Sequence, residues 1–425
     1  MRLGFCTALS LALVPLATDQ AAAAGFMVRE NSAESVGTVF SGDASRADEA
    51  ETAFANPAGM VRFARPEVEI GAAVAFPTIR FSGSATAAGT IPIQGTQGGQ
   101  AGQAGVIPNF YVVAPLSDSL FAGHAVTAPF GLQDNYTSMF VGRYQGIKTF
   151  VLSGDINPNI AWKVNDKVSI GAGISAQWLK VEQSAAIPQF LIARAAVPDA
   201  FFLFNGHDWA IGYNAGILLQ PNDTTRLGFT YRSGIAHNLS GSLDFTNAVI
   251  PLVSGPAKGS GFNLPGTAAM SLTHDFTPQW TASAGMQYNQ WSSLKTVAVT
   301  SGSNPPLSEQ EHYRNSWMFS AGGAYHVTSS LSLRAGAGWD ESPVTPHFRT
   351  VGVPDANRYM IGVGAGYVFA PGVDVDFGYS HYWAADSADV NSSVNSIDPF
   401  TGAVALTGDY HNYLDYFALS FRFAL

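Results

Sequence analysis

The sequence predicts an all-β membrane protein: a 14-stranded antiparallel transmembrane β-barrel plugged by a small, mostly helical N-terminal hatch. Three observations predict this fold. Charged residues make up only 12% of the 425 residues, about half the share of roughly 25% in an average soluble domain. The apolar residues occur in short pieces, whereas a membrane-spanning helix needs a run of about 20. Short polar turns alternate with long loops, as in a barrel with two unlike ends.

The composition also excludes several classes of protein. A formal net charge of −10 at pH 7 argues against a nucleic-acid partner. The single cysteine, Cys6, lies in the N-terminal segment, so the mature chain has neither a disulfide framework nor a Cys-based zinc site. No P-loop or HExxH motif occurs, and no local signature supports a hydrolase. We therefore expect no enzyme activity, no cofactor and no metal.

Residues 1–24 are interpreted as a signal peptide. Arg2 supplies positive charge, Leu3 to Ala17 form an apolar stretch, and the small residues that signal peptidase requires end at Ala24. Cleavage after Ala24 gives a mature chain that starts at Gly25. The alternative, a single anchor helix, is disfavoured because the apolar stretch is shorter than the roughly 18 residues a span needs. Export across an inner membrane follows.

Residues 25–65 form the predicted hatch. This segment is rich in acidic residues, Ala and Ser, and it lacks strand alternation. Short helices and turns fit it better, and Asn31-Ser32-Ala33-Glu34 has the appearance of a capping box.

Residues 66–425 form the predicted barrel, in which period-2 patterns and turn signals indicate fourteen strands. An even number of strands places both ends of the chain on the same side of the membrane, as in single-chain bacterial barrels. In the strand near 223–234, Leu227 and Phe229 lie on one face and Arg226 and Arg232 on the other. An Arg on the lipid face costs about 2–4 kcal/mol near the midplane, so the Arg-bearing faces should point inward. The expected strands are 66–84, 103–115, 119–130, 148–164, 167–183, 208–220, 223–246, 262–276, 279–300, 313–328, 330–341, 357–370, 372–390 and 409–425.

The connections between these strands differ in length in a regular way. Very short turns such as Asn165-Asp166 and Pro371-Gly372 alternate with long loops such as 131–147, 184–207 and 342–356. This is the pattern of periplasmic turns against extracellular loops in outer-membrane proteins. The alternative, a secreted β-sandwich or β-helix, gives no reason for such regularity.

Phe54-Ala55-Asn56-Pro57-Ala58-Gly59-Met60 and several further segments occur in an order that resembles the FadL/TodX family of outer-membrane transporters for long-chain fatty acids and other hydrophobic compounds. The resemblance covers nearly the whole mature chain, and it is most specific at the end of the hatch. One departure is the C-terminal Leu425, where outer-membrane barrels usually end on Phe. The matching segments include Phe54-Ala55-Asn56-Pro57-Ala58-Gly59-Met60, Ala128-Pro129-Phe130-Gly131-Leu132, Asn157-Pro158-Asn159-Ile160-Ala161-Trp162, Pro354-Asp355-Ala356-Asn357-Arg358 and Asp376-Phe377-Gly378-Tyr379.

The resemblance implies a fourteen-stranded barrel plugged by its N-terminal segment, a hatch that moves on ligand binding, and a kinked third strand that opens a gap in the wall. Asn56, Pro57 and Ala58 are the expected hatch motif, since Pro57 fixes φ and disfavours helix at Asn56. The alternative is an ordinary turn. For the wall kink we expect Gly123 and Pro129, because Gly weakens a strand and Pro removes a ladder bond. The alternative is that Gly123 and Pro129 only mark the end of a strand.

Two further sets of residues are candidates for ligand contact. An exposed apolar cluster in an extracellular loop should capture a hydrophobic ligand, although these residues could also pack among themselves; it comprises Phe190, Leu191, Ile192, Phe201, Phe202 and Phe204. A carboxylated ligand needs a buried cation, and the inward candidates are Arg226, Arg232, Arg334 and Arg358. The favoured alternative for most of these cations is a salt bridge to hatch acids such as Asp43 or Glu49.

The sequence therefore predicts an outer-membrane channel for uptake of hydrophobic small molecules, long-chain fatty acids or similar. The expected route is capture by extracellular loops, rearrangement of the hatch and lateral release through the barrel wall. Aromatic or alkane hydrocarbons are an alternative cargo, and a general porin or an outer-membrane lipid hydrolase is an alternative function. The expected partners are the ligand, outer-membrane lipid and the barrel-assembly machinery, and we expect a monomer.

Overall fold

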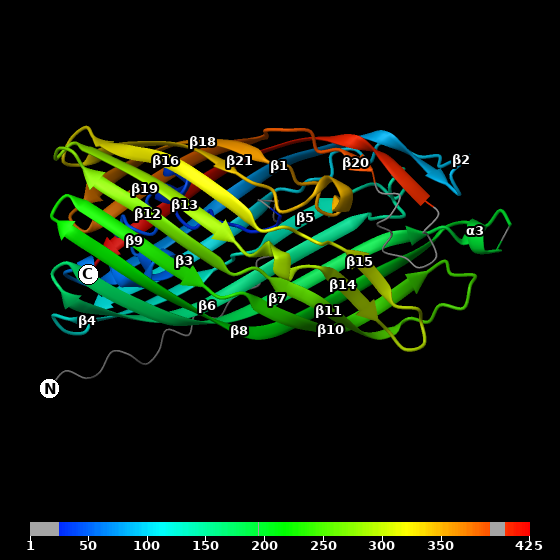
Figure 1. Ribbon diagram of the computed structural model, residues 1–425, viewed down its shortest axis with the longest axis horizontal. Coiled ribbons are helices and arrows are strands. Elements are labelled where there is room, and N and C mark those ends of the chain that lie inside the picture. The colour runs from blue at the N-terminus through cyan, green and yellow to red at the C-terminus, as the bar shows by residue number, and fades with distance from the viewer. Residues whose placement is uncertain (1–24, 194, 392–403) are drawn as a thin grey trace.

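The computed structural model describes residues 25–193, 195–391 and 404–425, which form a closed antiparallel barrel with the N-terminal segment inside it (Figure 1). The first strand, β1 Glu67–Ala87, pairs with the last, β21 Val404–Ala424, along their full lengths. On its other side β1 pairs with β3 Gly105–Pro115. The predicted signal peptide, residues 1–24, lies outside the described residues.

Fourteen barrel strands are present, as the sequence predicts. Several of them are divided by a break or bulge into two segments, and β2 Ile91–Pro92 is a short addition to β1. The other strands are β4 Leu120–Thr127 with β5 Gly131–Asn135, β6 Lys148–Asn165, β7 Val168–Ile187, β8 Ala200–Asn222, β9 Thr225–Arg232 with β10 Ile235–Thr246, β11 Gly255–Leu264 with β12 Thr267–Asp275, β13 Trp280–Asn289 with β14 Thr296–Thr300, β15 Leu307–Gln310 with β16 Ser316–His326, β17 Leu331–Asp340, β18 Arg358–Ala370, and β19 Val373–Ala384 with β20 Val390–Asn391.

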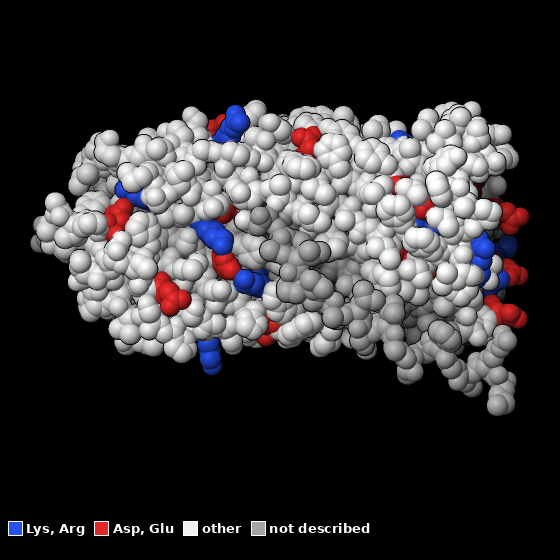
Figure 2. All heavy atoms as spheres, turned by 180° about the vertical axis from the view of Figure 1, so that it is seen from behind, with Lys and Arg blue, Asp and Glu red and all other residues white. Residues whose placement is uncertain are grey.

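The outer face of the barrel is largely apolar, and in Figure 2 the charged side chains gather at the end where the short turns lie and are scattered over the opposite half. Ile211 is 70% exposed and Phe369 is 72% exposed. Leu227 and Phe229 point outward as expected, whereas Arg226 is buried in the lumen. Such large exposed apolar side chains are stable only against lipid. No helix in the described part of the chain is long and apolar enough to cross a membrane.

Several strands extend further than the sequence predicted, among them β7, β8, β11 and β21. β7 continues to Ile187 and β8 begins at Ala200, so the expected 184–207 loop shortens to 188–199, with α3 Gln189–Ala193 inside it. The period-2 pattern is hidden because both faces of the start of β8 are apolar. β5 likewise lies within the expected 131–147 loop. The remaining short helices, η2 Trp291–Ser293 and η3 Pro346–Phe348, lie in loops.

The hatch consists of α1 Ala33–Thr38, α2 Thr52–Ala55 and η1 Pro57–Arg62, joined by turns. Ser32 caps α1, because its Oγ accepts a hydrogen bond from Ser35 N at 3.1 Å. The capping box predicted from Asn31 to Glu34 is not formed, because the N-cap is Ser32 and Glu34 is therefore the second helical residue rather than the third. Glu34 forms ion pairs instead.

Glycines in the wall let the hatch backbone approach closely. A Cβ atom on Gly228 of β9 would lie 1.8 Å from the carbonyl oxygen of Ala44. A Cβ atom on Gly336 of β17 would lie 2.1 Å from the carbonyl oxygen of Thr38. Since both contacts are with backbone, no side-chain movement relieves them, and the wall needs glycine at these places.

Candidate functional site

The hatch motif is fixed to the barrel wall by Asn56. This side chain is fully buried, and its Nδ2 donates to Ala44 O at 2.6 Å and to Ile217 O of β8 at 3.1 Å. Its Oδ1 accepts from Ala58 N at 3.1 Å, which caps η1. Ser169 of β7 donates to Ala58 O at 2.9 Å. The motif therefore joins the two halves of the hatch to two neighbouring wall strands.

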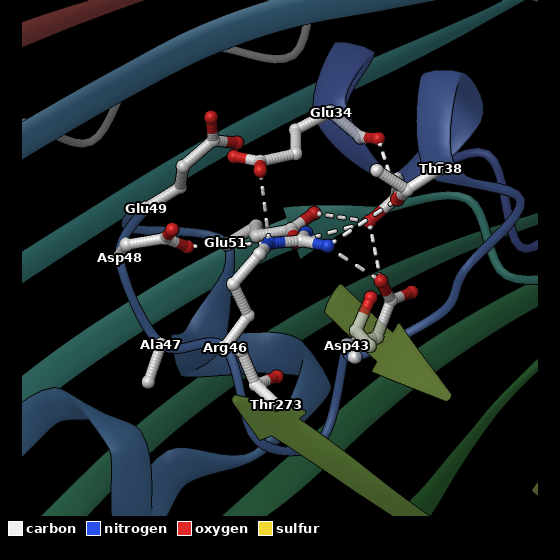
Figure 3. A network of polar contacts seen from close by, with 12 residues as sticks. Glu34, Thr38, Asp43, Arg46, Ala47, Asp48, Glu49, Glu51 and Thr273 are labelled. Atoms are coloured by element: carbon white, nitrogen blue, oxygen red, sulfur yellow. Dashed lines mark hydrogen bonds and ion pairs between the residues drawn. The ribbon is translucent and has the colours of Figure 1, made fainter. Parts of the chain in front are cut away.

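An ionic network centred on Arg46 holds the rest of the hatch together (Figure 3). The guanidinium lies 3.2 Å from Glu34 Oε1, 3.2 Å from Asp48 Oδ1 and 2.9 Å from Glu51 Oε1. Asp43 completes the group at 3.5 Å. Four carboxylates thus surround one cation, so the hatch alone carries an excess of negative charge.

Two arginines from the wall offset part of that excess. Arg334 of β17 lies 3.0 Å from Glu34 and 3.5 Å from Glu49, and it also pairs with Asp376 of β19 at 2.5 Å. Arg422 of β21 lies 3.0 Å from Asp376 and 3.6 Å from Glu49. Hatch and wall are therefore held by a shared network of buried ion pairs, whose breaking leaves uncompensated charge.

The carboxyl groups of the hatch respond differently to this environment. Burial and the neighbouring Asp43 raise the pKa of Glu51 to about 7, although Arg46 opposes the shift. Arg334 and Arg46 together hold the pKa of Glu34 well below its usual range against the effect of burial. Glu34 therefore keeps its charge at neutral pH, whereas Glu51 titrates in the physiological range.

A pH-dependent stability follows from Glu51. The pKa of Glu51 is higher in the folded state (about 7) than in the unfolded chain (about 4.5), so the folded protein binds more protons between these values. We expect the melting temperature to fall as pH rises from about 4.5 to 7, with a loss of up to about 3 kcal/mol from this group. Glu51→Gln should flatten this part of the profile. An unchanged slope in the variant would contradict the assignment.

An apolar cluster, called here the lumen cluster, fills the extracellular half of the barrel interior. Phe26 and Met27 at the start of the hatch belong to it, and the ring centroids of Phe26 and Trp291 are 4.9 Å apart. Its other members come from eight wall strands, β5 to β8, β10, β11, β14 and β15, and from the loops between them. They include Leu132, Val151, Leu179, Val181, Phe202, Phe204, Leu239, Phe262, Val297 and Leu307.

The expected capture residues are divided by the structure. Phe201, Phe202 and Phe204 lie on β8 rather than in a loop, which corrects the expectation, because the strand begins at Ala200. Phe202 and Phe204 point into the lumen cluster. Phe190 and Leu191 of α3 are partly buried against a second apolar cluster, and Phe201 packs against the same cluster. Ile192 lies in α3.

The third barrel strand is interrupted at the residues that join β4 to β5. β4 pairs with β3 only from Phe110 to Pro115, while β5 pairs with β6 and, on its other side, only with the segment before β3, through a bridge between Asp134 and Gly102. Pro129 lies in this break, where it lacks an amide hydrogen. Gly123 does not lie in the break, because it pairs with Val113 and with Asn159 within the regular ladder. A Cβ at Gly123 would lie 2.2 Å from Met60 Sδ, so this glycine accommodates the hatch.

The hatch covers this break from the lumen side. Met27 forms a β-bridge with Phe130. Val28 N donates to Pro129 O, and Gly131 N donates to Phe26 O, both at 2.9 Å. The residues that cover the break thus also belong to the lumen cluster.

The four candidate cations have different partners. Arg226 pairs with Asp275 at 3.2 Å, Arg358 pairs with Asp340 at 2.9 Å, and Arg334 pairs with hatch acids as described. Arg232 has no carboxylate within 4.0 Å among the described residues. Its guanidinium lies 3.9 Å from the ring centroid of Phe54 and donates to Ser175 Oγ at 2.8 Å.

Two contacts of the hatch with the wall have no counterpart in the sequence pattern. Gly25 N donates to the buried Asp355 Oδ2 at 2.9 Å, and Arg29 pairs with Asp340 at 2.9 Å. Both join residues more than 300 positions apart, so only the closed barrel brings them together. Among the residues that the structure describes, no group of three or more His, Cys, Asp or Glu could hold a metal ion.

A closed apolar-faced barrel with a polar plug, an apolar lumen and a covered strand break defines a plugged outer-membrane transport protein. The model of the family "Outer membrane protein transport protein (OMPP1/FadL/TodX)" matches residues 14–425, so the chain belongs to this family. It is located in the outer membrane.

Similar proteins agree with this assignment. The "Long-chain fatty acid transport protein" of Salmonella typhi is 28% identical over 96% of this chain and 98% of its own length. Outer membrane protein P1 of Haemophilus influenzae is 27% identical over 86% of this chain and 87% of its own. Among solved structures, a Pseudomonas aeruginosa FadL homologue superposes with a TM-score of 0.88 at 24% identity over 94% of this chain and all of that one. The Pseudomonas putida toluene transporter TodX gives 0.70 at 17%, over 95% and 100%.

Proposed function

We propose that this protein takes up long-chain fatty acids, or similar hydrophobic molecules, through the lumen cluster and releases them sideways at the strand break. One observation carries the proposal: Phe26 and Met27 pack in the lumen cluster while Phe26 to Val28 cover the break. A ligand that occupies the cluster competes with Phe26 and Met27 for the same apolar surface. Since ligand binding can displace them only by making better contacts, capture and opening are coupled.

The exit by the periplasmic end is unfavourable for such a ligand. The pocket at that end lies between hatch and wall and is lined by charged side chains, among them Glu34, Arg46, Asp48, Arg62 and Arg226. An apolar molecule gains nothing by entering this polar space. The break, in contrast, opens onto the lipid-facing side of the barrel, where an apolar ligand is stable.

The proposed cargo follows from Arg232. Leu179 of the lumen cluster and Ser175, which contacts Arg232, are inward residues of β7 four positions apart, roughly 13 Å along the strand. A carboxylate held by Arg232 could thus extend its chain into the cluster. The relatives that are named fatty acid transporters support this cargo. The toluene transporters of the same fold support hydrocarbons as the second candidate.

Replacement of Arg232 by Gln should separate the two cargoes. A charge-assisted hydrogen bond contributes about 1.5–3 kcal/mol, so oleate uptake should fall roughly tenfold or more, whereas toluene uptake should stay unchanged. The measurement is uptake by cells that lack their own transporter. Arg314→Gln in an exposed loop pair with Glu341 is the matched control. Equal loss for both cargoes would remove Arg232 from carboxylate binding.

The lateral route is tested with a fatty acid that carries a photoreactive diazirine at its chain end. Cross-links should map to Phe202, Phe204 and the edges of β3 and β5. Cross-links only to the periplasmic turns would contradict lateral release. We further propose that the protein acts as a monomer without catalysis, with outer-membrane lipid and the barrel-assembly machinery as its other partners; the transport functions of its relatives support the absence of catalysis.

A further inference from the structure

Several arginines lie inside the barrel, among them the buried Arg29, Arg46 and Arg358. Of the six lysines in the sequence, Lys148, Lys180 and Lys258 lie on lipid-facing positions of β6, β7 and β11, because their strand neighbours Leu179, Val181 and Ala257 point inward. All three are in the extracellular half of the barrel, where lysine on the outer face needs an explanation.

Strand register places these cations in one band. Lys180 pairs with His207, His207 with Ser240, and Ser240 with Lys258. Because adjacent strands are about 4.8 Å apart, the Cα atoms of Lys180 and Lys258 are roughly 15 Å apart across the surface. The next outward pair on β7 and β8 toward the periplasm is Trp178 and Trp209. Exposed Trp at this place marks the membrane interface, so the cations lie at the level of lipid headgroups.

The two lysines nearest the strand break are held in place. Glu182 pairs with Lys180 at 2.7 Å and also with Lys148. Both ammonium groups lie over the Phe150 ring, with Nζ to centroid distances of 5.8 Å for Lys148 and 5.6 Å for Lys180. Glu182 neutralises only one of the two charges. The ammonium groups are therefore fixed and keep an outward-facing surplus of positive charge.

We propose that this lysine band, defined by Lys148, Lys180, His207 and Lys258, binds the phosphate groups of a phosphorylated glycolipid of the outer leaflet. Its acyl chains lie against Trp178 and Trp209, and its phosphates meet the ammonium groups above them. Basic clusters at a membrane interface recognise anionic headgroups in this way. The nearest outward acid besides Glu182 is Asp244, four residues from Ser240 along β10 and roughly 13 Å away, and it is hydrogen-bonded to Ser242.

The band lies on the extracellular side of the strand break, since Lys148 pairs in register with Asn135, five residues beyond Phe130 and roughly 17 Å along the strand. A bound glycolipid would thus occupy the lipid annulus on the extracellular side of the proposed exit. Its binding does not depend on the cargo of the transporter, because no residue of the band belongs to the lumen.

The test is native mass spectrometry of the full-length protein in detergent, titrated with diphosphorylated lipid A. Lys148→Gln/Lys180→Gln should weaken binding at least tenfold, whereas Lys148→Arg/Lys180→Arg should retain it. The matched control is Lys163→Gln/Lys167→Gln at the opposite end of the barrel, where Lys163 also pairs with an acid, Asp166. It should change binding less than twofold. Heat-modifiable gel mobility checks folding, and Lys258→Gln alone replaces the double variant if that does not fold.

Three outcomes overturn the proposal. Equal loss in the two Lys→Gln double variants would show that net charge alone drives binding. Equal binding of lipid A without phosphates would show that the acyl chains are sufficient. Full competition by millimolar inorganic phosphate would show an ion site rather than a lipid site.

Discussion

Asn56→Ala is expected to reduce fatty acid uptake by at least tenfold while the amount of protein at the cell surface stays unchanged. The substitution removes three hydrogen bonds and takes from Ala44 O and Ala58 N the partner that they have in this structure, whereas Ile217 stays paired in the ladder between β7 and β9. Each buried unsatisfied group costs about 1–3 kcal/mol. The barrel ladder is untouched, so the loss falls on the hatch. Uptake of radiolabelled oleate and surface labelling measure the two quantities.

The effect should reach the ligand through Phe54. Asn56 directly follows α2, and Phe54 of that helix accepts a hydrogen bond from Arg232 at 3.0 Å through its carbonyl and packs its ring on the guanidinium. Release of Asn56 therefore displaces the floor of the proposed ligand site. Asn222→Ala, which removes an amide from an exposed turn where it caps Thr224, is the matched control and should leave uptake unchanged. Unchanged uptake in Asn56→Ala would remove Asn56 from the mechanism, and lost surface protein would assign it to assembly.

Arg334→Met is expected to loosen the whole hatch and to make the barrel leaky to polar solutes. Removal of this cation leaves Glu34, Glu49 and Asp376, each buried to 97% or more, with fewer opposite charges. Breaking a buried ion pair from one side costs about 3–5 kcal/mol. We expect long-lived open events in planar bilayers, where the unaltered protein stays closed, and a lower melting temperature.

The matched control for this charge is Arg65→Met, since Arg65 is exposed at the end of the hatch. Arg334→Lys keeps the charge but cannot contact three carboxylates in fixed directions, so it should give an intermediate conductance. A closed and equally stable Arg334→Met protein would show that Arg422 alone holds the wall side of the network.

The strand pattern of this protein could be predicted from sequence because lipid and lumen impose opposite demands on alternate residues. The fourteen strands, the inward Arg226 and the plug all follow from it and are confirmed. The period-2 pattern did not reveal a strand at Ala200–Phe204. There the lumen cluster on one side and the second apolar cluster on the other make both faces of β8 apolar. There the local sequence carries no period-2 signal, although β8 is continuous.

The candidate site was only partly predictable for a related reason. The Asn56 motif and Pro129 carry local backbone signals, because proline restricts φ and removes a donor. Their functions in the hatch and at the exit stay predictions. Gly123 carries the same kind of signal, yet it lies in a regular ladder against Met60. A glycine in a strand indicates that another group packs closely against the backbone, but it does not indicate which group.

The chain by itself determined that alternate residues face lipid, that the first described residues are unsuited to a strand, and that Arg226 points into the lumen. Only closure of the barrel decided which acid each buried arginine meets, that Phe26 and Met27 cover the strand break, and that Arg232 meets no carboxylate among the described residues. The physical reason is range: alternation is a property of neighbours two residues apart, whereas the contact of Gly25 with Asp355 spans 330 positions.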